Sequence, residues 1–266
     1  EEMKTMMHQR SVFYEGFDAD WTTQGPGDAG ARINTVAVHP NDDNIIYLGF
    51  SGGGIFKTID GGVTWNPIFD DQPYLAISDI TLDPGNPEII YVGTGDHNVT
   101  GYPFVGDGIY KSENGGESWQ HLGLTEQRIV SKIIVNPTNS DIVYAACLGL
   151  PFVRNDERGL YKSIDGGNTW SQVLFVSNQS GIVDFLINPN NPEILYAASW
   201  DRIRNNTESI VAGPNAKILK TIDGGDSWTE LTNGLPIGDQ GRIGLAMSSA
   251  NPDIIFAMYV ASNSQL

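Results

Sequence analysis

A motif of nine residues occurs four times in this chain and constrains the fold more than any other feature of the sequence. Each copy places a lysine, a serine or threonine, an acidic or amide residue, two glycines and a tryptophan in the same order. The four tryptophans are 54, 51 and 58 residues apart. A period of about fifty residues predicts a repeat architecture, in which each unit packs on its neighbours. The copies are residues 57–65, 111–119, 162–170 and 220–228.

A second motif precedes each glycine-rich copy and divides the unit further. In the first unit, Val38-His39-Pro40 leads into Ile45-Ile46-Tyr47. The unit then contains four short extended runs, which we name strands A to D and place at 33–38, 44–49, 54–58 and 64–69. A fifth copy of the second motif, residues 247–256, is followed by no glycine-rich copy before residue 266.

Four antiparallel strands per unit predict an all-β fold, a β-propeller of four-stranded blades. Sheets this small bury their faces only by stacking on one another, and radial stacking gives a propeller. A row of β-sandwich domains is the alternative, but each sandwich needs roughly twice as many residues. We expect missing sequence to complete the ring. The expected blades are about 33–76, 77–126, 130–178 and 182–238, with a partial fifth blade at 241–260.

The first 26 residues are expected to differ from the repeats. Residues 21–26, Trp-Thr-Thr-Gln-Gly-Pro, are similar to the start of strand D at Trp65 but have no strands A to C before them. We therefore expect 21–26 to be the outer strand that closes the last blade, and 1–20 to be a leader. Residues 21–266 would then form one incomplete propeller domain.

The acidic or amide residue of each glycine-rich motif is expected to hold a turn together. Its oxygen can accept hydrogen bonds from N–H groups of the turn, glycine supplies positive φ, and tryptophan fills the wedge between blades. We predict a structural and not a catalytic role for these residues, and a slightly weaker turn where asparagine replaces aspartate. They are Asp60, Trp65, Asn114, Trp119, Asp165, Trp170, Asp223 and Trp228.

Charge excludes two classes of partner. The chain has 15 Lys and Arg against 32 Asp and Glu, a formal charge of −17, which disfavours nucleic acid and anionic membrane surfaces. It also has no apolar run long enough to span a bilayer. The single cysteine, Cys147, lies in an apolar run and predicts a buried thiol without a disulfide. Both a reducing cytosol and a bacterial cell exterior remain open.

The loops between strands B and C are the expected binding surface. They lie on one rim of a propeller, opposite the glycine-rich turns, and they lengthen along the chain. Their aromatic, cationic and carboxylate residues suit a sugar-stacking or peptide-binding patch, but each is equally suited to anchoring a loop. The candidates are Asp96, His97, Tyr102, Arg154, Asp156, Glu157, Trp200, Asp201 and Arg202, with Phe104, Phe152, Arg158 and Arg204 beside them.

Neither a metal nor a cofactor is expected. Asp96-His97-Asn98 could supply ligands to a structural calcium ion, but the sequence shows no metal-ligand spacing such as His-x-x-x-His. Asp156 and Glu157 could serve a glycosidase as acid and base, yet adjacent side chains usually point apart. Solvated loop residues are the alternative for both groups.

The glycine-rich motif resembles the Asp-box of the propellers known as bacterial neuraminidase repeats. That resemblance implies two enzyme classes to check. Sialidases carry Arg-Ile-Pro near the first blade, whereas Arg32-Ile33 is followed here by Asn34. Xyloglucan-active hydrolases place a catalytic aspartate in the first B–C turn, where this chain has Ser51.

Over residues 21–260 the chain resembles large secreted bacterial Asp-box proteins with sortilin-like propellers. The matching segments are Trp21 to Pro26, Gly52 to Thr58, Gly93 to Gly95 and Arg158 to Ser163. Many such proteins come from Bacteroidota and are exported by the type IX pathway. The resemblance therefore implies an extracellular or cell-surface location and a secretion machinery as partner.

These observations lead to one functional hypothesis and its alternatives. We expect a secreted or surface-displayed interaction module that binds a glycan or a protein through the rim of B–C loops. The alternative is a glycoside hydrolase whose catalytic carboxylates lie partly outside this sequence. An assembly factor like the photosystem-associated Asp-box propellers is disfavoured, since those present an arginine patch and this chain is acidic.

Overall fold

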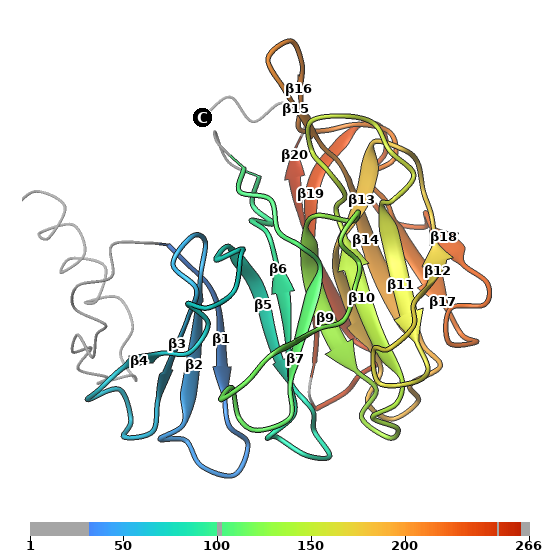
Figure 1. Ribbon diagram of the computed structural model, residues 1–266. Coiled ribbons are helices and arrows are strands. Elements are labelled where there is room, and N and C mark those ends of the chain that lie inside the picture. The colour runs from blue at the N-terminus through green and yellow to red at the C-terminus, as the bar shows by residue number, and fades with distance from the viewer. Residues whose placement is uncertain (1–31, 100–102, 249, 262–266) are drawn as a thin grey trace, which may run out of the picture.

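The computed structural model describes residues 32–99, 103–248 and 250–261 (Figure 1). The leader expected at 1–20 and the closing strand expected at 21–26 lie outside the described residues. Within those ranges the chain forms strands and turns and no helix. Four sheets have four strands each, and we call them blades 1 to 4. Blade 5 is the two-stranded sheet that follows them.

The strands of each blade follow one another in chain order, and every pair is antiparallel. This confirms an all-β propeller fold. Blade 1 is β1 (Ile33–Val38), β2 (Ile46–Phe50), β3 (Ile55–Thr58) and β4 (Asn66–Pro67), and blade 2 is β5 (Ile77–Leu82), β6 (Ile90–Thr94), β7 (Ile109–Ser112) and β8 (Gln120–His121). Blade 3 is β9 (Val130–Val135), β10 (Val143–Cys147), β11 (Gly159–Ser163) and β12 (Ser171–Leu174). Blade 4 is β13 (Ser180–Ile187), β14 (Leu195–Asp201), β17 (Ile218–Thr221) and β18 (Thr229–Leu231), and blade 5 is β19 (Gln240–Met247) and β20 (Ile255–Ala261). A hairpin of β15 (Ile203–Arg204) and β16 (Ser209–Ile210) extends from blade 4.

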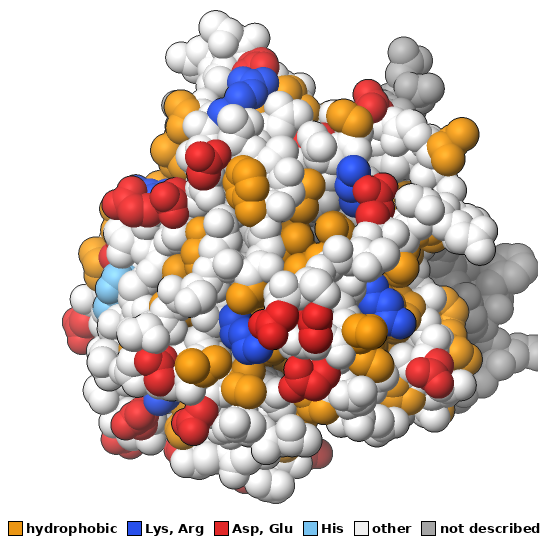
Figure 2. Space-filling view, turned by 90° about the vertical axis from the view of Figure 1, so that its right-hand side faces the viewer, with side chains coloured by type: hydrophobic (Ala, Val, Ile, Leu, Met, Phe, Trp, Pro, Cys, Tyr) orange, Lys and Arg blue, Asp and Glu red, His pale blue; other side chains and the backbone are white. Residues whose placement is uncertain are grey.

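The core is a series of apolar layers, one between each pair of neighbouring blades. In Figure 1 the sheets stand side by side, and the first strand of each contacts the first strand of the next. The second strands of blades 1 to 4 are buried on both faces, which explains their nearly continuous apolar sequences. Cys147 is fully buried in the layer between blades 2 and 3, as its sequence context predicts. Figure 2 shows carboxylates spread over one outer face among fewer Lys and Arg.

The Asp-box turns connect the third and fourth strands of blades 1 to 4, and their aspartates hold them as expected. In blade 1, Asp60 Oδ1 accepts hydrogen bonds from the Thr64 amide (2.8 Å) and the Thr58 hydroxyl (2.7 Å). Its Oδ2 accepts one from the Thr64 hydroxyl at 2.6 Å. In blade 2, Asn114 Oδ1 still accepts a hydrogen bond from the backbone amide of Ser118 at 3.0 Å. Its side-chain nitrogen donates to the Ser118 hydroxyl at 2.9 Å, where an aspartate oxygen accepts from the hydroxyl in blade 1. The turn is thus preserved without the charge.

Three Asp-box tryptophans fill the wedges between blades. Trp119 donates from its indole nitrogen to the Ile68 carbonyl of blade 1 at 2.7 Å, and Trp170 donates to the Leu122 carbonyl of blade 2 at 3.0 Å. Trp228 packs on the apolar layer between blades 3 and 4. These contacts are consistent with a structural role for the three side chains.

The Asp-box turns of blades 2, 3 and 4 are also held by the preceding blade, a role that sequence reasoning did not assign. The Tyr91 hydroxyl of blade 2 donates to the Gly166 carbonyl in the blade 3 turn at 3.0 Å. Tyr144 and Lys162 of blade 3 donate to the Gly224 carbonyl in the blade 4 turn, each at 2.9 Å. The tyrosine and lysine that recur with each motif thus link consecutive blades.

We expect acid to weaken the Asp-box turns. Hydrogen bonds from the hydroxyl and amide of Thr64, and those of Thr169, lower the pKa of Asp60 and of Asp165 to about 2 from 3.8. Because these folded-state pKa values are depressed, the stabilisation is complete above about pH 4 and is lost as the pH falls toward about 2. Tryptophan fluorescence during urea unfolding at several pH values measures this loss. An Asp60→Asn/Asp165→Asn variant, which copies the natural Asn114, should show a weaker pH dependence; an unchanged dependence would contradict the assignment.

Candidate functional site

The B–C loops form one rim of the propeller, opposite the Asp-box turns. They comprise residues 51–54, 95–108, 148–158 and 202–217, so each of the last three is much longer than the first. Figure 1 shows the β15–β16 hairpin at the far end of this rim, beyond the blade sheets. Irregular loops on a rigid set of sheets are the usual location of binding residues.

Burial separates the predicted site residues into two groups. Arg154, Asp156 and Glu157 are exposed, and His97 is half-buried. Asp96, Trp200, Asp201 and Arg202 are buried, and Tyr102 lies outside the described residues. A ligand on the rim can therefore reach the blade 3 loop but not the buried group.

Trp200 is a core residue, so its interpretation as a stacking surface for ligand is wrong. It is 6% exposed and packs in the apolar layer between blades 4 and 5, where its indole nitrogen donates to the Val211 carbonyl at 2.9 Å. Arg202 lies over its ring at 5.4 Å and donates to the Val99 carbonyl of the blade 2 loop at 2.6 Å. Burial lowers the pKa of Arg202 to about 10, so it stays charged at neutral pH.

Asp201 is also an internal anchor and not an accessible carboxylate. It is fully buried, and it accepts hydrogen bonds from the Ser180 hydroxyl and from the Asn215 amide, the latter at 2.9 Å. Its carboxylate fixes the returning end of the blade 4 loop. Its side chain presents no surface to a ligand on the rim in this structure.

The residues considered for calcium bind other groups of the protein. Asp96 is 1% exposed and accepts from Arg32 at 2.6 Å, while Asn98 Oδ1 accepts from Arg242 of blade 5 at 2.7 Å. Burial and Arg242 lower the pKa of His97 to about 4, which leaves it neutral at pH 7. No cluster of three metal-ligating side chains occurs in the described ranges. This segment therefore joins blades 1, 2 and 5 through these side chains.

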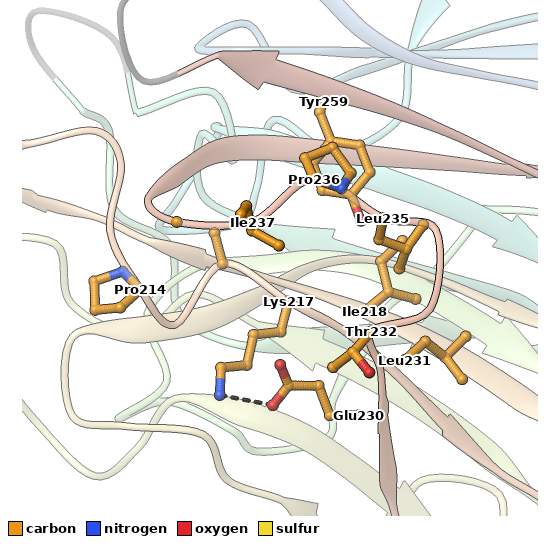
Figure 3. Close-up of a pocket in the computed structure, with 12 residues that line it drawn as sticks. Pro214, Lys217, Ile218, Glu230, Leu231, Thr232, Leu235, Pro236, Ile237 and Tyr259 are labelled. Carbon is orange, nitrogen blue, oxygen red and sulfur yellow. Dashed lines mark hydrogen bonds and ion pairs between the residues drawn. The ribbon is translucent and has the colours of Figure 1, made fainter.

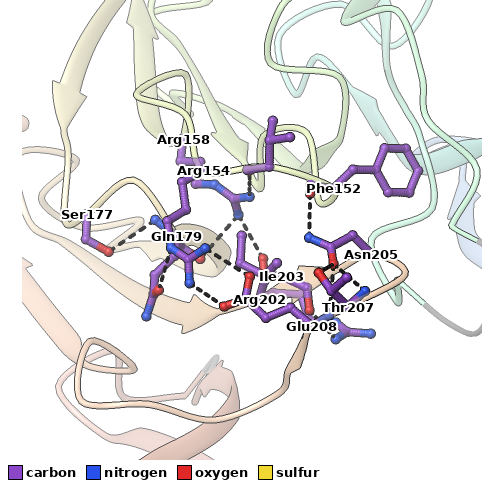
Figure 4. A network of polar contacts seen from close by, with 11 residues as sticks. Phe152, Arg154, Arg158, Ser177, Gln179, Arg202, Ile203, Asn205, Thr207 and Glu208 are labelled. Carbon is purple, nitrogen blue, oxygen red and sulfur yellow. Dashed lines mark hydrogen bonds and ion pairs between the residues drawn. The ribbon is translucent and has the colours of Figure 1, made fainter.

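Arg158 anchors the blade 3 loop from within. Its side chain is fully buried, and burial lowers its pKa to about 10. No carboxylate in the described part of the chain forms an ion pair with it, so its charge is compensated by backbone dipoles (Figure 4). The acceptors are the carbonyl oxygens of Leu148, Leu150, Val153, Gln179 and Arg202, at 2.7–3.3 Å.

The tips of the blade 3 and blade 4 loops are joined by an exposed ion pair. Arg154 donates through both terminal nitrogens to Glu208, at 2.9 and 2.7 Å. Asn205 of the hairpin donates to the Phe152 carbonyl at 2.9 Å, and Figure 4 shows the Phe152 ring pointing away from this network. Phe152 is 38% exposed and Phe104 is 54% exposed. Among the described residues of the B–C loops, these two rings, and not Trp200, offer exposed aromatic surface to a ligand.

A cavity of about 340 Å³ lies on this rim between blades 2 and 3, and we call it the rim cavity. The blade 3 loop forms one wall, and the connection from blade 2 to blade 3 forms the other. It combines two carboxylates, one guanidinium, one amide and two aliphatic side chains. The lining residues are Glu126, Arg128, Leu150, Val153, Asn155 and Glu157.

A second cavity, of about 280 Å³, lies between blade 4 and β20 (Figure 3). Ile218, Leu231 and Tyr259 give it an apolar wall, and the Lys217–Glu230 ion pair at 2.7 Å lies at one side. The corresponding space between blades 1 and 2 is filled by the ring of Tyr110 on β7, which packs on Phe69 of blade 1. The second cavity thus occupies a position that side chains fill between other blades.

Comparison with models of protein families identifies the family of this chain. A family model described as Sortilin-Vps10 (sortilin, neurotensin receptor 3) matches residues 107–260, more than half of the sequence. The chain belongs to the Sortilin-Vps10 family. The Sortilin-Vps10 match begins in the blade 2 loop and ends in β20, so it includes the rim cavity, Arg158 and the hairpin.

Curated relatives of this Sortilin-Vps10 chain include two xyloglucanases. That of Paenibacillus sp. is 23% identical over 240 residues, which cover 82% of this chain and 22% of the relative. That of Acetivibrio thermocellus is 23% identical over 233 residues, which cover 78% and 26%. The chain thus spans about a quarter of the length of these relatives.

A solved structure supports the fold. The GH74 xyloglucanase from Xanthomonas campestris superposes with a TM-score of 0.67 at 15% identity, covering 88% of this chain and 36% of that one. At this identity the likeness shows the propeller fold. Among the described residues, no helix is long and apolar enough to cross a membrane.

Proposed function

We propose that this chain is part of a glycoside hydrolase-like propeller that acts on a polysaccharide through the rim of B–C loops. The observation that carries the proposal is the similarity to xyloglucanases over about four-fifths of the chain. The exposed rings of Phe104 and Phe152 support it, because sugar rings stack their C–H faces on aromatic side chains. Polysaccharides are outside the cell, so we propose an extracellular location too; export by the type IX machinery stays a prediction.

The described carboxylates of the rim differ in whether a substrate can reach them. Asp96 and Asp201 are buried, and Ser51 occupies the position where the resemblance places a catalytic aspartate. Glu126, Asp156 and Glu157 are exposed on the rim. A chain that binds without turnover would match the interaction-module hypothesis.

The test separates binding from hydrolysis. The chain is applied to gels containing xyloglucan, mixed-linkage β-glucan or pectin, and release of reducing sugar is measured in parallel. We expect retardation by at least one neutral polysaccharide, weakened about thirtyfold by a Phe104→Ala/Phe152→Ala variant, since each of the two lost stacking contacts costs about 1 kcal/mol. Ile164→Ala, an exposed apolar residue in the Asp-box turn of blade 3, is the control. Absence of binding to every polysaccharide would overturn the proposal.

A further inference from the structure

We propose that the rim cavity is a subsite for one sugar residue of a neutral polysaccharide, and that its charges exclude uronic acids. This inference rests on the proposed function and adds the site and the chemistry of the ligand. At about 340 Å³ the rim cavity lies within the range of about 300–1,000 Å³ typical of small-ligand sites.

The walls of the rim cavity suit the two faces of a sugar ring. Leu150 and Val153 supply aliphatic surface for C–H groups, and the polar side chains of the cavity supply hydrogen-bonding groups for hydroxyls. The aliphatic wall is held in place, because the carbonyl oxygens of both residues accept hydrogen bonds from the buried Arg158. A wall fixed before binding lowers the entropic cost of taking up a ligand.

Arg128 supplies unused donors. Its guanidinium lies over the ring of Tyr74 at 5.6 Å and is half-buried. Nothing in the described ranges accepts a hydrogen bond from it or pairs with its charge, although Glu126 and Glu157 line the same cavity. A guanidinium that is positioned by stacking and has free N–H groups is suited to donate to sugar oxygens.

Glu157 and Glu126 supply acceptors. One oxygen of Glu157 accepts from the Gln127 amide at 2.8 Å, and Gln127 is itself buried and contacts the Tyr161 hydroxyl at 3.1 Å. Glu157 is therefore oriented by a neutral buried group while its second oxygen remains available. Glu126 is exposed on the opposite wall. Carboxylates in such positions accept hydrogen bonds from pairs of sugar hydroxyls.

Charge then decides which sugars can enter. Two carboxylates and one guanidinium give the rim cavity a net negative charge, and the whole chain carries −17. The carboxylate of a uronic acid would lie close to like charges, whereas the hydroxyls of a neutral sugar can pair with both glutamates and with Arg128. The rim cavity therefore favours neutral glycans for two reasons. Its glutamates repel acidic sugars, and its polar side chains form hydrogen bonds with the hydroxyls of neutral ones.

The experiment compares neutral and acidic ligands. Calorimetric titration of the whole chain uses a xyloglucan oligosaccharide and an oligogalacturonide at low salt. We expect the neutral ligand to bind at least about tenfold more tightly, and Glu126→Gln/Glu157→Gln to weaken it about tenfold, the equivalent of about 1.4 kcal/mol. The same variant should bind the oligogalacturonide more tightly than the wild type does. Glu117→Gln, in the Asp-box turn on the opposite rim, is the matched control and should change neither affinity.

The two ways to fail are distinguishable. If the glutamate variant keeps wild-type affinities while Phe104→Ala/Phe152→Ala loses binding, the subsite is wrong and the proposed function stands. If the wild type binds no neutral glycan, both fail. The urea unfolding midpoint of each variant shows whether an affinity change reflects lost folding, which these exposed substitutions should not cause.

Discussion

Replacing Arg158 with alanine should lower the free energy of unfolding by about 3–5 kcal/mol, because it leaves five buried or partly buried carbonyl oxygens without their donor. Loss of the anchor should also weaken glycan binding, since Leu150 and Val153 of the rim cavity depend on it. Urea unfolding followed by tryptophan fluorescence measures the first effect. Calorimetric titration with the xyloglucan oligosaccharide measures the second.

The same loop supplies the matched control for this prediction. Arg154→Ala removes an arginine four residues away whose partner, Glu208, is about as exposed as it is. An exposed ion pair contributes only about 0–1 kcal/mol, so the unfolding free energy should change little. Arg158→Lys should fall between the two, because an ammonium group keeps the charge but cannot reach five acceptors. Equal effects of Arg154→Ala and Arg158→Ala would contradict the anchoring role.

Replacing Asp184 with alanine should lower the free energy of unfolding by about 2–4 kcal/mol. Asp184 lies on β13 and joins three blades: it accepts from Lys132 of blade 3 at 2.6 Å and from the Leu245 amide of blade 5 at 2.7 Å. Its removal leaves a half-buried ammonium group and a backbone N–H without their acceptor. Urea unfolding curves of the variant and the wild type give the difference.

A conservative variant tests which contact dominates. Asp184→Asn keeps an oxygen for the Leu245 amide but loses the attraction to Lys132, so roughly half of the effect should remain. A double-mutant cycle with Lys132→Met isolates the coupling between the two side chains. Additive effects in that cycle would show that the ion pair does not link blades 3 and 4 energetically.

The site could be predicted only in part. The sequence correctly indicated that the B–C loops after the first blade are long and carry unrepeated polar and aromatic residues. It could not separate anchors from ligand contacts, because Trp200 and Phe152 are both aromatic loop residues and only burial distinguishes them. Glu126 and Arg128 were missed, since they belong to the connection between two blades and not to a B–C loop.

The sequence by itself determined the strand order within each blade and the position of the Asp-box turns. The period of about fifty residues, the alternation of apolar runs and the paired glycines act over short distances, so the strand order and the Asp-box turns follow from local chemistry. The contacts between blades and the shape of the rim cavity depend on residues far apart in the sequence, so only the tertiary structure shows them. Arg242 meets Asn98 across 144 positions, the Tyr91 hydroxyl holds a glycine of the next blade, and the rim cavity has walls from two blades. Such contacts form only when the blades stack, and no local pattern encodes which loops will then meet.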